Sequence, residues 1–363
     1  MPKSSDSRNS IVFFPSLKEM SGNPYWAILV DALQKAGVAF LSGSPDIFTL
    51  KWLFQNRNLV NILHIHFIRP FYLSGTPGKI RFIYVLRLAF NMLLARSLGY
   101  ELVYTFHDSE PPVQVQPVWA DILAHHIVIK LSNKVIVHCG VAEQLLSQKY
   151  GRRNNVFIVD HPNYINWYPN TITKAVARKK LGLSGELITF AFFGAVRPNK
   201  GVQTLIQAFR KTQDRKFRLI IAGQVSKSSD SYSQHLQEIA RGDDRISFYF
   251  RQIPDDEVQV FMKSADIVVL PFSKILTSGS AILAMSFGRP VIVPKLGCLP
   301  ELVGVDVGWQ FEPGNPDSLA NAMQSAAISD FCQFGQRAYD KISLFSQEHL
   351  AAQTIQAYLN HSE

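Results

Sequence analysis

The sequence of 363 residues predicts two α/β domains in tandem, each a doubly wound parallel sheet of the Rossmann-like class. Short, fully apolar runs alternate with longer helical stretches, as expected for parallel strands covered on both faces. The alternation breaks once, over the polar and basic residues 166–186, and then restarts. The length also suits two domains, since a domain usually spans about 100–200 residues.

The apolar runs give the expected strands in chain order. In the first half they are "IVFFPS", "VAFLS", "ILHIHF", "ELVYTFH", "KVIVHC" and "NVFIVD", with helices between them at 25–37, 79–98, 117–132 and 140–150. In the second half they are "LITFAFFGA", "FRLIIAG", "ISFYF", "DIVVLPF", "PVIVP" and "GWQFE". The chain closes on helical patterns at 316–327 and 330–362.

The break at 166–186 reads as a linker and sets the domain boundaries. We predict a first domain over 1–172 and a second over 173–345, followed by a terminal helix over 346–363. Ligands of doubly wound sheets bind outside the carboxyl ends of the strands. We therefore expect the active site in a cleft between the two domains, lined by the loops that follow the strands.

Composition restricts the class and the location of the protein. A hydrophobic fraction of 47% with 18% charged residues describes a globular, core-forming chain. The polar start "MPKSSDSRNS" is not a signal peptide, and arginines interrupt the apolar run 80–100, so we predict no transmembrane helix. The three cysteines lack the spacing of a zinc knuckle. These features favour a cytoplasmic protein without a bound metal.

The net charge of +9 is uneven, because residues 1–172 carry 16 basic and 10 acidic side chains. A basic first half indicates an anionic partner: a membrane surface, nucleic acid or a phosphorylated substrate. No nucleic-acid motif is present, so we do not expect nucleic acid. The anionic inner face of the plasma membrane is the preferred partner, with a merely solvated basic face as the alternative.

Cations and small polar residues follow the strands of the second half. A strand ends at Gly194, and Arg197 and Lys200 follow it. Arg251 and Ile253 follow the third strand. A helix starts after the turn Thr277, Ser278, Gly279 and Ser280. Cations beside a helix N-terminus stabilise the same negative charge, so the pattern predicts a diphosphate site. In isolation, Arg197 and Lys200 are also compatible with a solvated pair of loop charges.

These segments resemble a known family when they are taken in order. "FFGAVRPNKGVQTLIQAF", "LIIAG", "IPDDEVQVFMKSADIVVLPF", "TSGSAILAMSFGRPVIVPKLGCLPELV" and "FEPGNPDSLANAM" are similar to the donor-binding half of glycosyltransferase family 4 (group 1), with the GT-B fold. The resemblance covers about residues 185–325. It is weaker in the first half, at "LVYTFHDSEPP" and "LSNKVIVHCGVAEQLL". The spacing "FGxxRPxKG" resembles a subgroup of bacterial polysaccharide enzymes.

The resemblance implies the transfer of a sugar from a nucleotide-diphosphate donor without a metal or other cofactor. Arg197 and Lys200 would neutralise the diphosphate, and Gly194 would allow its close approach. Arg251 and Ile253 would hold the base, and residues 277–280 would cradle the phosphates. His107 would act from the first domain as a catalytic residue facing the donor sugar. The terminal helix would pack back on the first domain.

Two positions depart from the family pattern. Many members carry glutamates on either side of the phosphate cradle, one touching the donor sugar and one the ribose. Ile275 and Leu283 stand at these positions, and neither side chain accepts a hydrogen bond. The sequence therefore predicts a subtype that holds its donor through other groups.

The acceptor side is predicted from residues that follow strands of the first half. Asn23 and Tyr25 follow the first strand, and His66 and Asp108 follow two others. His107, Asp108 and His66 are the groups that could serve as a base if the reaction inverted the anomeric centre, whereas the family is generally retaining. His64 and His66 alternate in "ILHIHF", so we expect one to face away, and either could be a core histidine.

The predicted function is a hexosyltransferase acting on a polyprenyl-linked, lipid-linked or polysaccharide acceptor in bacterial envelope or exopolysaccharide assembly. A soluble transferase with a small-molecule acceptor is the first alternative. The second is a sugar-nucleotide-binding subunit without catalysis, because both glutamate positions are apolar.

Overall fold

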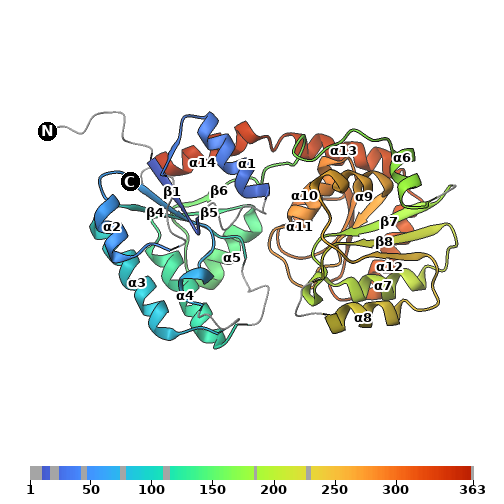
Figure 1. Ribbon diagram of the computed structural model, residues 1–363, viewed down its shortest axis with the longest axis horizontal. Helices are drawn as coiled ribbons and strands as arrows, with labels where there is room; N and C mark the ends of the chain where they lie inside the picture. The colour runs from blue at the N-terminus through green and yellow to red at the C-terminus, as the bar shows by residue number, and fades with distance from the viewer. Residues whose placement is uncertain are drawn as a thin grey trace. The chain divides into compact units, whose positions relative to one another are not determined.

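The computed structural model describes residues 10–16, 24–41, 47–73, 79–108, 115–183, 186–225 and 230–360. The chain divides into two compact units. Unit 1 comprises Met1–Pro162 and Gln347–Glu363, and unit 2 comprises Asn163–Ser346. Each unit holds one sheet of six parallel strands flanked by helices (Figure 1). The predicted α/β fold class is therefore confirmed.

Unit 1 has the strand order β2-β1-β3-β4-β5-β6. All six strands lie where apolar runs predict them, because β-branched and aromatic residues pack well when both sheet faces are covered. The strands are β1 (Ser10–Phe14), β2 (Ala39–Phe40), β3 (Ile62–Ile65), β4 (Glu101–Thr105), β5 (Lys134–Val137) and β6 (Val156–Ile158). The helices are α1 (Pro24–Lys35), α2 (Leu50–Asn56), α3 (Phe82–Ser97), α4 (Val118–Leu131), α5 (Gly140–Tyr150) and α14 (Gln347–Leu359).

The terminal helix α14 is part of unit 1, where it packs against α1 and β5 (Figure 1). Two polar contacts from buried residues fix its end. The Tyr358 hydroxyl lies 2.7 Å from Nδ1 of His64, and the Lys134 amine donates to the Tyr358 carbonyl at 2.5 Å. The amine of Lys134 also pairs with Glu101 at 2.5 Å. The helical pattern over 330–362 is thus two helices, one in each unit.

Unit 2 has the strand order β12-β11-β10-β7-β8-β9, which places β7 in the interior beside β10. The strands are β7 (Ile188–Phe193), β8 (Phe217–Ala222), β9 (Ile246–Tyr249), β10 (Ile267–Val269), β11 (Val291–Pro294) and β12 (Gly308–Phe311). The helices are α6 (Lys174–Lys180), α7 (Val202–Lys211), α8 (Asp230–Ile239), α9 (Val258–Ser264), α10 (Gly279–Ser286), α11 (Leu299–Val303), α12 (Pro316–Ala327) and α13 (Phe331–Ser343).

The segment 166–186 is not the linker that its composition predicts. Its described residues belong to unit 2, which begins at Asn163, and they form α6 against α9. Lys174 and Arg178, one helical turn apart, both pair with the carboxylate of Asp266, whose side chain is 1% exposed. The basic composition therefore neutralises a buried carboxylate, and the compact units divide ten residues before the predicted boundary.

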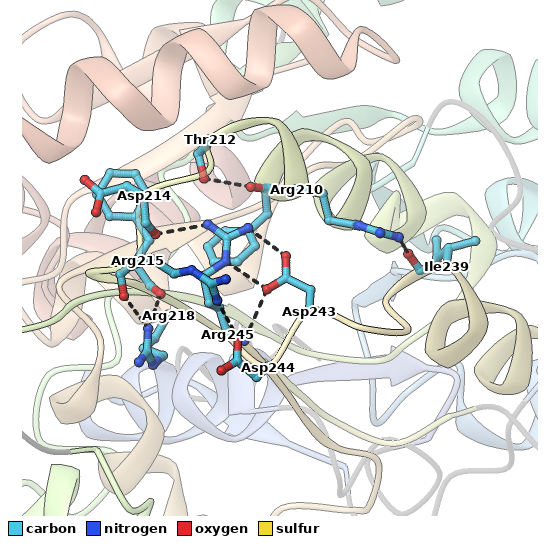
Figure 2. A network of polar contacts seen from close by, with 11 residues as sticks. Arg210, Thr212, Asp214, Arg215, Arg218, Ile239, Asp243, Asp244 and Arg245 are labelled. Atoms are coloured by element: carbon cyan, nitrogen blue, oxygen red, sulfur yellow. Dashed lines mark hydrogen bonds and ion pairs between the residues drawn. The ribbon is translucent and has the colours of Figure 1, made fainter.

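A polar network ties together the turns that precede β8 and β9 in unit 2 (Figure 2). Arg245, which is 5% exposed, donates to both carboxylate oxygens of Asp243 at 2.8 and 2.6 Å and to the carbonyl of Asp214 at 3.0 Å. Its guanidinium also lies 4.6 Å from the ring centroid of Phe209. This buried arginine braces the amino edge of the sheet.

Replacing Arg245 with methionine should lower the free energy of unfolding by about 2 kcal/mol, since charge-assisted hydrogen bonds are lost and Asp243 keeps a poorly solvated charge. Arg215→Met is the matched control from the same network. The side chain of Arg215 is 84% exposed and, within the described part of the chain, pairs only with Asp244, so its replacement should cost less than about 0.5 kcal/mol. Urea unfolding of unit 2 measures both, and equal losses would contradict the bracing role.

None of the helices in the described part of the chain has the length and apolar character needed to cross a membrane.

Candidate functional site

The loops that follow β7 and β10 lie side by side, because these strands are neighbours in the sheet of unit 2. The amide of Ser273 donates to the carbonyl of Asn199 at 3.2 Å. A Cβ on Gly201, whose φ is +69°, would overlap the carbonyl oxygen of Pro271. The amine of Lys200 lies 4.5 Å from the ring centroid of Phe272. Only glycine fits at 201, and this close approach fixes Lys200 beside the second loop.

The second loop leads into the first turn of α10, as predicted. Ser278 caps the helix by accepting from the amide of Ala281 at 3.2 Å. The amides of Gly279 and Ser280 are in the first turn, where N–H groups have no acceptor within the helix. The hydroxyl of Ser280 lies 3.3 Å from the Cβ position of Gly194, at the end of β7. The end of β7 and the start of α10 therefore adjoin, and the pair can bind an anion.

Arg197 supplies a second cation to the loop after β7. It is half-buried, and its guanidinium makes no hydrogen bond or ion pair with any other described residue. Together with Lys200, it gives the loop after β7 two positive charges, one before and one within the short turn Pro198–Lys200. We name Arg197, Lys200 and the turn 277–280 the cradle.

Arg251 and Ile253 follow a different strand from the cradle residues. They follow β9, and both β8 and β7 separate that edge strand from β10 in the sheet order. The guanidinium of Arg251 pairs with the carboxylate of Glu257, and its side chain is 47% exposed. In this structure the described contacts of Arg251 are with its own loop.

The two apolar departures from the family pattern differ in burial, since Leu283 is buried and Ile275 is half-buried. Leu283 is only 6% exposed and belongs to the core face of α10. The backbone of Ile275 closely approaches Gly297, where a Cβ would lie 2.6 Å from the Ile275 carbonyl oxygen. Sequence reasoning missed Tyr164, whose hydroxyl oxygen lies 2.9 Å from the Cβ position of Gly279. Tyr164 lies two residues before the predicted linker 166–186, and no local sequence pattern marks it as a site residue.

Unit 1 gathers histidines from four of its strand ends into one histidine chain, in which His66 and His138 are buried and His107 and His161 are half-buried. Nδ1 of His66 lies 3.1 Å from Nε2 of His107, and Nδ1 of His107 lies 3.3 Å from Nε2 of His138. Nδ1 of His138 lies 2.8 Å from the carbonyl oxygen of Val159. The ring of His161 lies 5.7 Å from that of His138. Of these histidines, sequence reasoning selected only His66 and His107.

The carbonyl of Val159, at one end of the histidine chain, fixes the tautomers of the neutral rings. A carbonyl only accepts, so Nδ1 of His138 carries its proton and its Nε2 accepts from His107. His107 then carries its proton on Nδ1, and its Nε2 accepts from His66. The last ring, His66, is therefore left with a bare lone pair on Nε2. This nitrogen is buried and has no hydrogen-bond partner among the residues that the structure describes.

Burial keeps these rings uncharged. It lowers the pKa of His66 and of His107 well below 6.5, and neighbouring histidines lower both further. Burial also lowers the pKa of His64 and of His161 to about 3. The pKa of His138 is lowered by burial too, and the carbonyl of Val159 and the charge of Asp160 oppose that shift.

The other predicted acceptor residues are placed as follows. Tyr25 is 4% exposed and packs against the histidine chain. Its ring centroid lies 5.2 Å from that of His107 and 4.9 Å from that of His161. Asp108 is half-buried after β4, and Asn23 lies outside the described residues. The prediction that His64 and His66 face opposite ways is wrong. Residues two apart in a strand share a face, and the two rings stack at 4.0 Å.

Both nitrogens of His107 are engaged by other histidines, so its predicted catalytic role would require one of these bonds to change.

The site also offers no protein ligand set for a metal: among the residues that the structure describes, no group of three or more His, Cys, Asp or Glu could hold one.

Comparisons with known proteins agree with this geometry. Residues 188–328 match the family model for glycosyl transferases group 1. The chain is 25% identical over 308 residues to a GDP-mannose:glycolipid 4-beta-D-mannosyltransferase of Xanthomonas campestris, covering 84% of this chain and 79% of that protein. A D-inositol 3-phosphate glycosyltransferase of Corynebacterium glutamicum is 31% identical over 192 residues, which are 50% of this chain and 46% of that protein.

Solved structures resemble the whole chain. Sucrose-phosphate synthase from Thermosynechococcus elongatus matches with a TM-score of 0.72 and 17% identity, over 97% of this chain and 98% of that one. HepE from Anabaena, in complex with UDP, matches with a TM-score of 0.74 and 17% identity, over 96% and 99%.

The chain has the GT-B fold of these structures, and the matched segment and the relatives support a glycosyltransferase. The match of residues 188–328 to the group 1 model confirms the resemblance seen in the sequence.

Proposed function

We propose that this glycosyltransferase transfers a hexose from a nucleotide-diphosphate sugar to a lipid-linked or polysaccharide acceptor, in the assembly of bacterial envelope glycans or exopolysaccharide. The cradle is the observation that carries the donor assignment. Its two cations follow β7, and the first turn of α10 adjoins the end of the same strand, so a diphosphate bound there would have its charge stabilised by both. The glycolipid acceptor in the name of the Xanthomonas relative supports the acceptor class.

The proposed reaction needs no metal and retains the anomeric configuration, as the resembled family generally does; inversion is the alternative that the β-linked product in the name of the Xanthomonas relative favours. Arg197 and Lys200 supply the positive charge that a divalent ion would otherwise bring to the leaving diphosphate. Retention requires no protein base on the acceptor side. The product's anomeric configuration, read by NMR, tests this. An inverted product would contradict retention and would select His66, whose Nε2 lone pair is open, as the group to examine.

A panel of nucleotide-diphosphate sugars tests the function directly. Release of nucleoside diphosphate with one donor, increased by a polyprenyl-linked glycan, is the expected result. Release stimulated instead by a small polyol phosphate would support a soluble transferase, the alternative that the inositol phosphate relative favours. Nucleotide binding without release from any donor would identify a binding subunit and refute the transferase proposal.

A lipid-linked acceptor implies that the protein binds a membrane surface. Unit 1 has a group of exposed side chains suited to such binding. Apolar side chains at 83, 86, 90 and 93 form a stripe along α3, and their exposed fractions range from 46% to 63%. The ring of Phe82 meets that of Trp119, which extends the apolar surface onto α4. Arg81 and Arg87 lie beside the stripe, over the ring of Tyr84. Apolar residues rimmed by cations suit an anionic bilayer, so we propose a peripheral location on the inner face of the plasma membrane.

Replacing Phe90 with glutamate should lower partitioning onto anionic liposomes about tenfold or more, because the change removes an apolar contact and adds a repelled charge. Ile328→Glu is the control, since Ile328 is 90% exposed and lies in unit 2. Flotation at low salt measures both variants. Equal flotation of Phe90→Glu and the unmodified protein would contradict the docking surface.

A further inference from the structure

Unit 2 has a cavity of about 410 Å³ on the side of its sheet where the strands begin, whereas the cradle lies where they end. It is lined by residues of α6, α9 and α13 and by the turn that ends α10. Asp266 precedes β10 and Arg289 precedes β11, so the cavity adjoins the amino ends of these strands. The cradle follows the carboxyl ends. The two sites are therefore separate.

The charges that line the cavity are unbalanced. Lys174, Lys263 and Arg289 line it, and Asp266 is its one acidic lining residue. That carboxylate is already neutralised, because it pairs with Lys174 and with Arg178 and accepts from the amide of Thr189 at 2.8 Å. The charge of Asp266 also acts on Arg289, but neither Lys263 nor Arg289 forms an ion pair with any residue that the structure describes.

The two remaining cations make few contacts. Arg289 donates only to carbonyls, from Nε to Phe287 at 3.1 Å and from Nη1 to Ala265 at 3.0 Å. The half-buried Lys263 makes no hydrogen bond or ion pair with another described residue. Burial and the neighbouring charge of Arg289 both lower the pKa of Lys263. An anion between these groups would relieve their repulsion and supply the missing acceptor.

We propose that this cavity binds a small phosphate-bearing molecule through Lys263 and Arg289. Its volume is within the range of small-molecule pockets, roughly 300–1,000 Å³. A phosphate offers several acceptor oxygens, which match the mobile ammonium of Lys263 and the remaining N–H groups of Arg289. Tyr339 and Gln336 line the same cavity and give the uncharged part of the ligand an aromatic and an amide contact.

Cys332 provides a local probe, because this exposed free cysteine lines the cavity. Inorganic phosphate and glucose 6-phosphate should slow its alkylation by N-ethylmaleimide, followed by peptide mass spectrometry, whereas uncharged glucose should not. In Lys263→Met the concentration for half-protection should rise about tenfold, since a charge-assisted contact is lost. Lys211→Met, a surface change elsewhere in unit 2, should leave that concentration unchanged.

The cradle also attracts phosphate, so Lys200→Ala separates the two sites. Protection of Cys332 that persists in Lys200→Ala and weakens in Lys263→Met supports the proposal. Three results would overturn it: no protection by either phosphate compound, equal protection by glucose, or protection that Lys263→Met leaves intact. The readout does not use transferase activity, so it is independent of the proposed function.

Discussion

Replacing Lys200 with alanine is expected to lower turnover by roughly a hundredfold or more, because preorganised charge at a leaving group is worth that much in the transition state. The amine is positioned by the ring of Phe272 and by the close packing of Gly201 against Pro271. It therefore needs little reorganisation to meet the diphosphate as the glycosidic bond breaks. Release of nucleoside diphosphate from the active donor measures the effect.

The loss should appear mainly in kcat, since the leaving group gains negative charge only as the reaction proceeds. Lys211→Ala is the matched control. Lys211 ends α7, the helix that follows Lys200, and pairs with Asp317 at the surface. An unchanged turnover number in Lys200→Ala would remove this residue from the mechanism, and a change confined to KM would make it a ground-state binding group.

The cradle could be predicted from the sequence because each of its parts is local. A strand ending at Gly194, a helix cap at Ser278 and the cations between them follow from apolar runs and turn residues. Their meeting follows from one rule, that parallel strands end at the same edge. Arg251 follows the edge strand β9, and its place in the sheet could not be predicted, because the order of strands is not local information.

The histidine chain could not be predicted in the same way. His66, His107 and His138 belong to three different strand ends, and the distances between them depend on the register of β3, β4 and β5. A lone histidine in an apolar run is equally compatible with a core position. Nor does sequence alone reveal a carbonyl such as that of Val159, which determines every tautomer along the chain.

The linker was misread for a related reason. A basic, polar segment is typical of a solvated connection, and its partner Asp266 is far away in sequence. Buried charges need partners, so such a segment can be structural whenever a carboxylate precedes a strand elsewhere. Lys174 and Arg178, spaced by four residues, are the one local sign of a helix with a common target.

Acidification is expected to unfold unit 1 selectively. A histidine that is neutral when folded and has a pKa of 6.5 when unfolded takes up a proton on unfolding at lower pH. For His64 and His161, with a pKa of about 3, this uptake begins below pH 6.5 and continues down to about pH 3. Above pH 6.5 both states are neutral, so the pH has no effect through these groups.

The expected loss is large. Each of these histidines lowers the free energy of unfolding by about 1.4 kcal/mol per pH unit below 6.5, so the pair costs about 4 kcal/mol at pH 5. The lowered pKa values of His66, His107 and His138 act in the same direction. Whole domains are stable by only about 5–15 kcal/mol. Unit 1 should therefore lose its protection against amide hydrogen exchange between pH 6.5 and 5.

Unit 2 provides the internal control, because its one histidine, His235, is exposed on α8. Exchange in peptides of β3, β4 and β5 should accelerate on acidification, beyond the intrinsic effect of pH, while β7 and β8 stay protected. His161→Asn should reduce the pH slope in unit 1 by about 1.4 kcal/mol per unit, whatever it does to stability at pH 7, since one proton-binding group is gone. His235→Asn should not change the slope. Equal protection of unit 1 at pH 7 and pH 5 would mean that its histidines are not held neutral, and the tautomer assignment that leaves His66 with an open lone pair would fail with it.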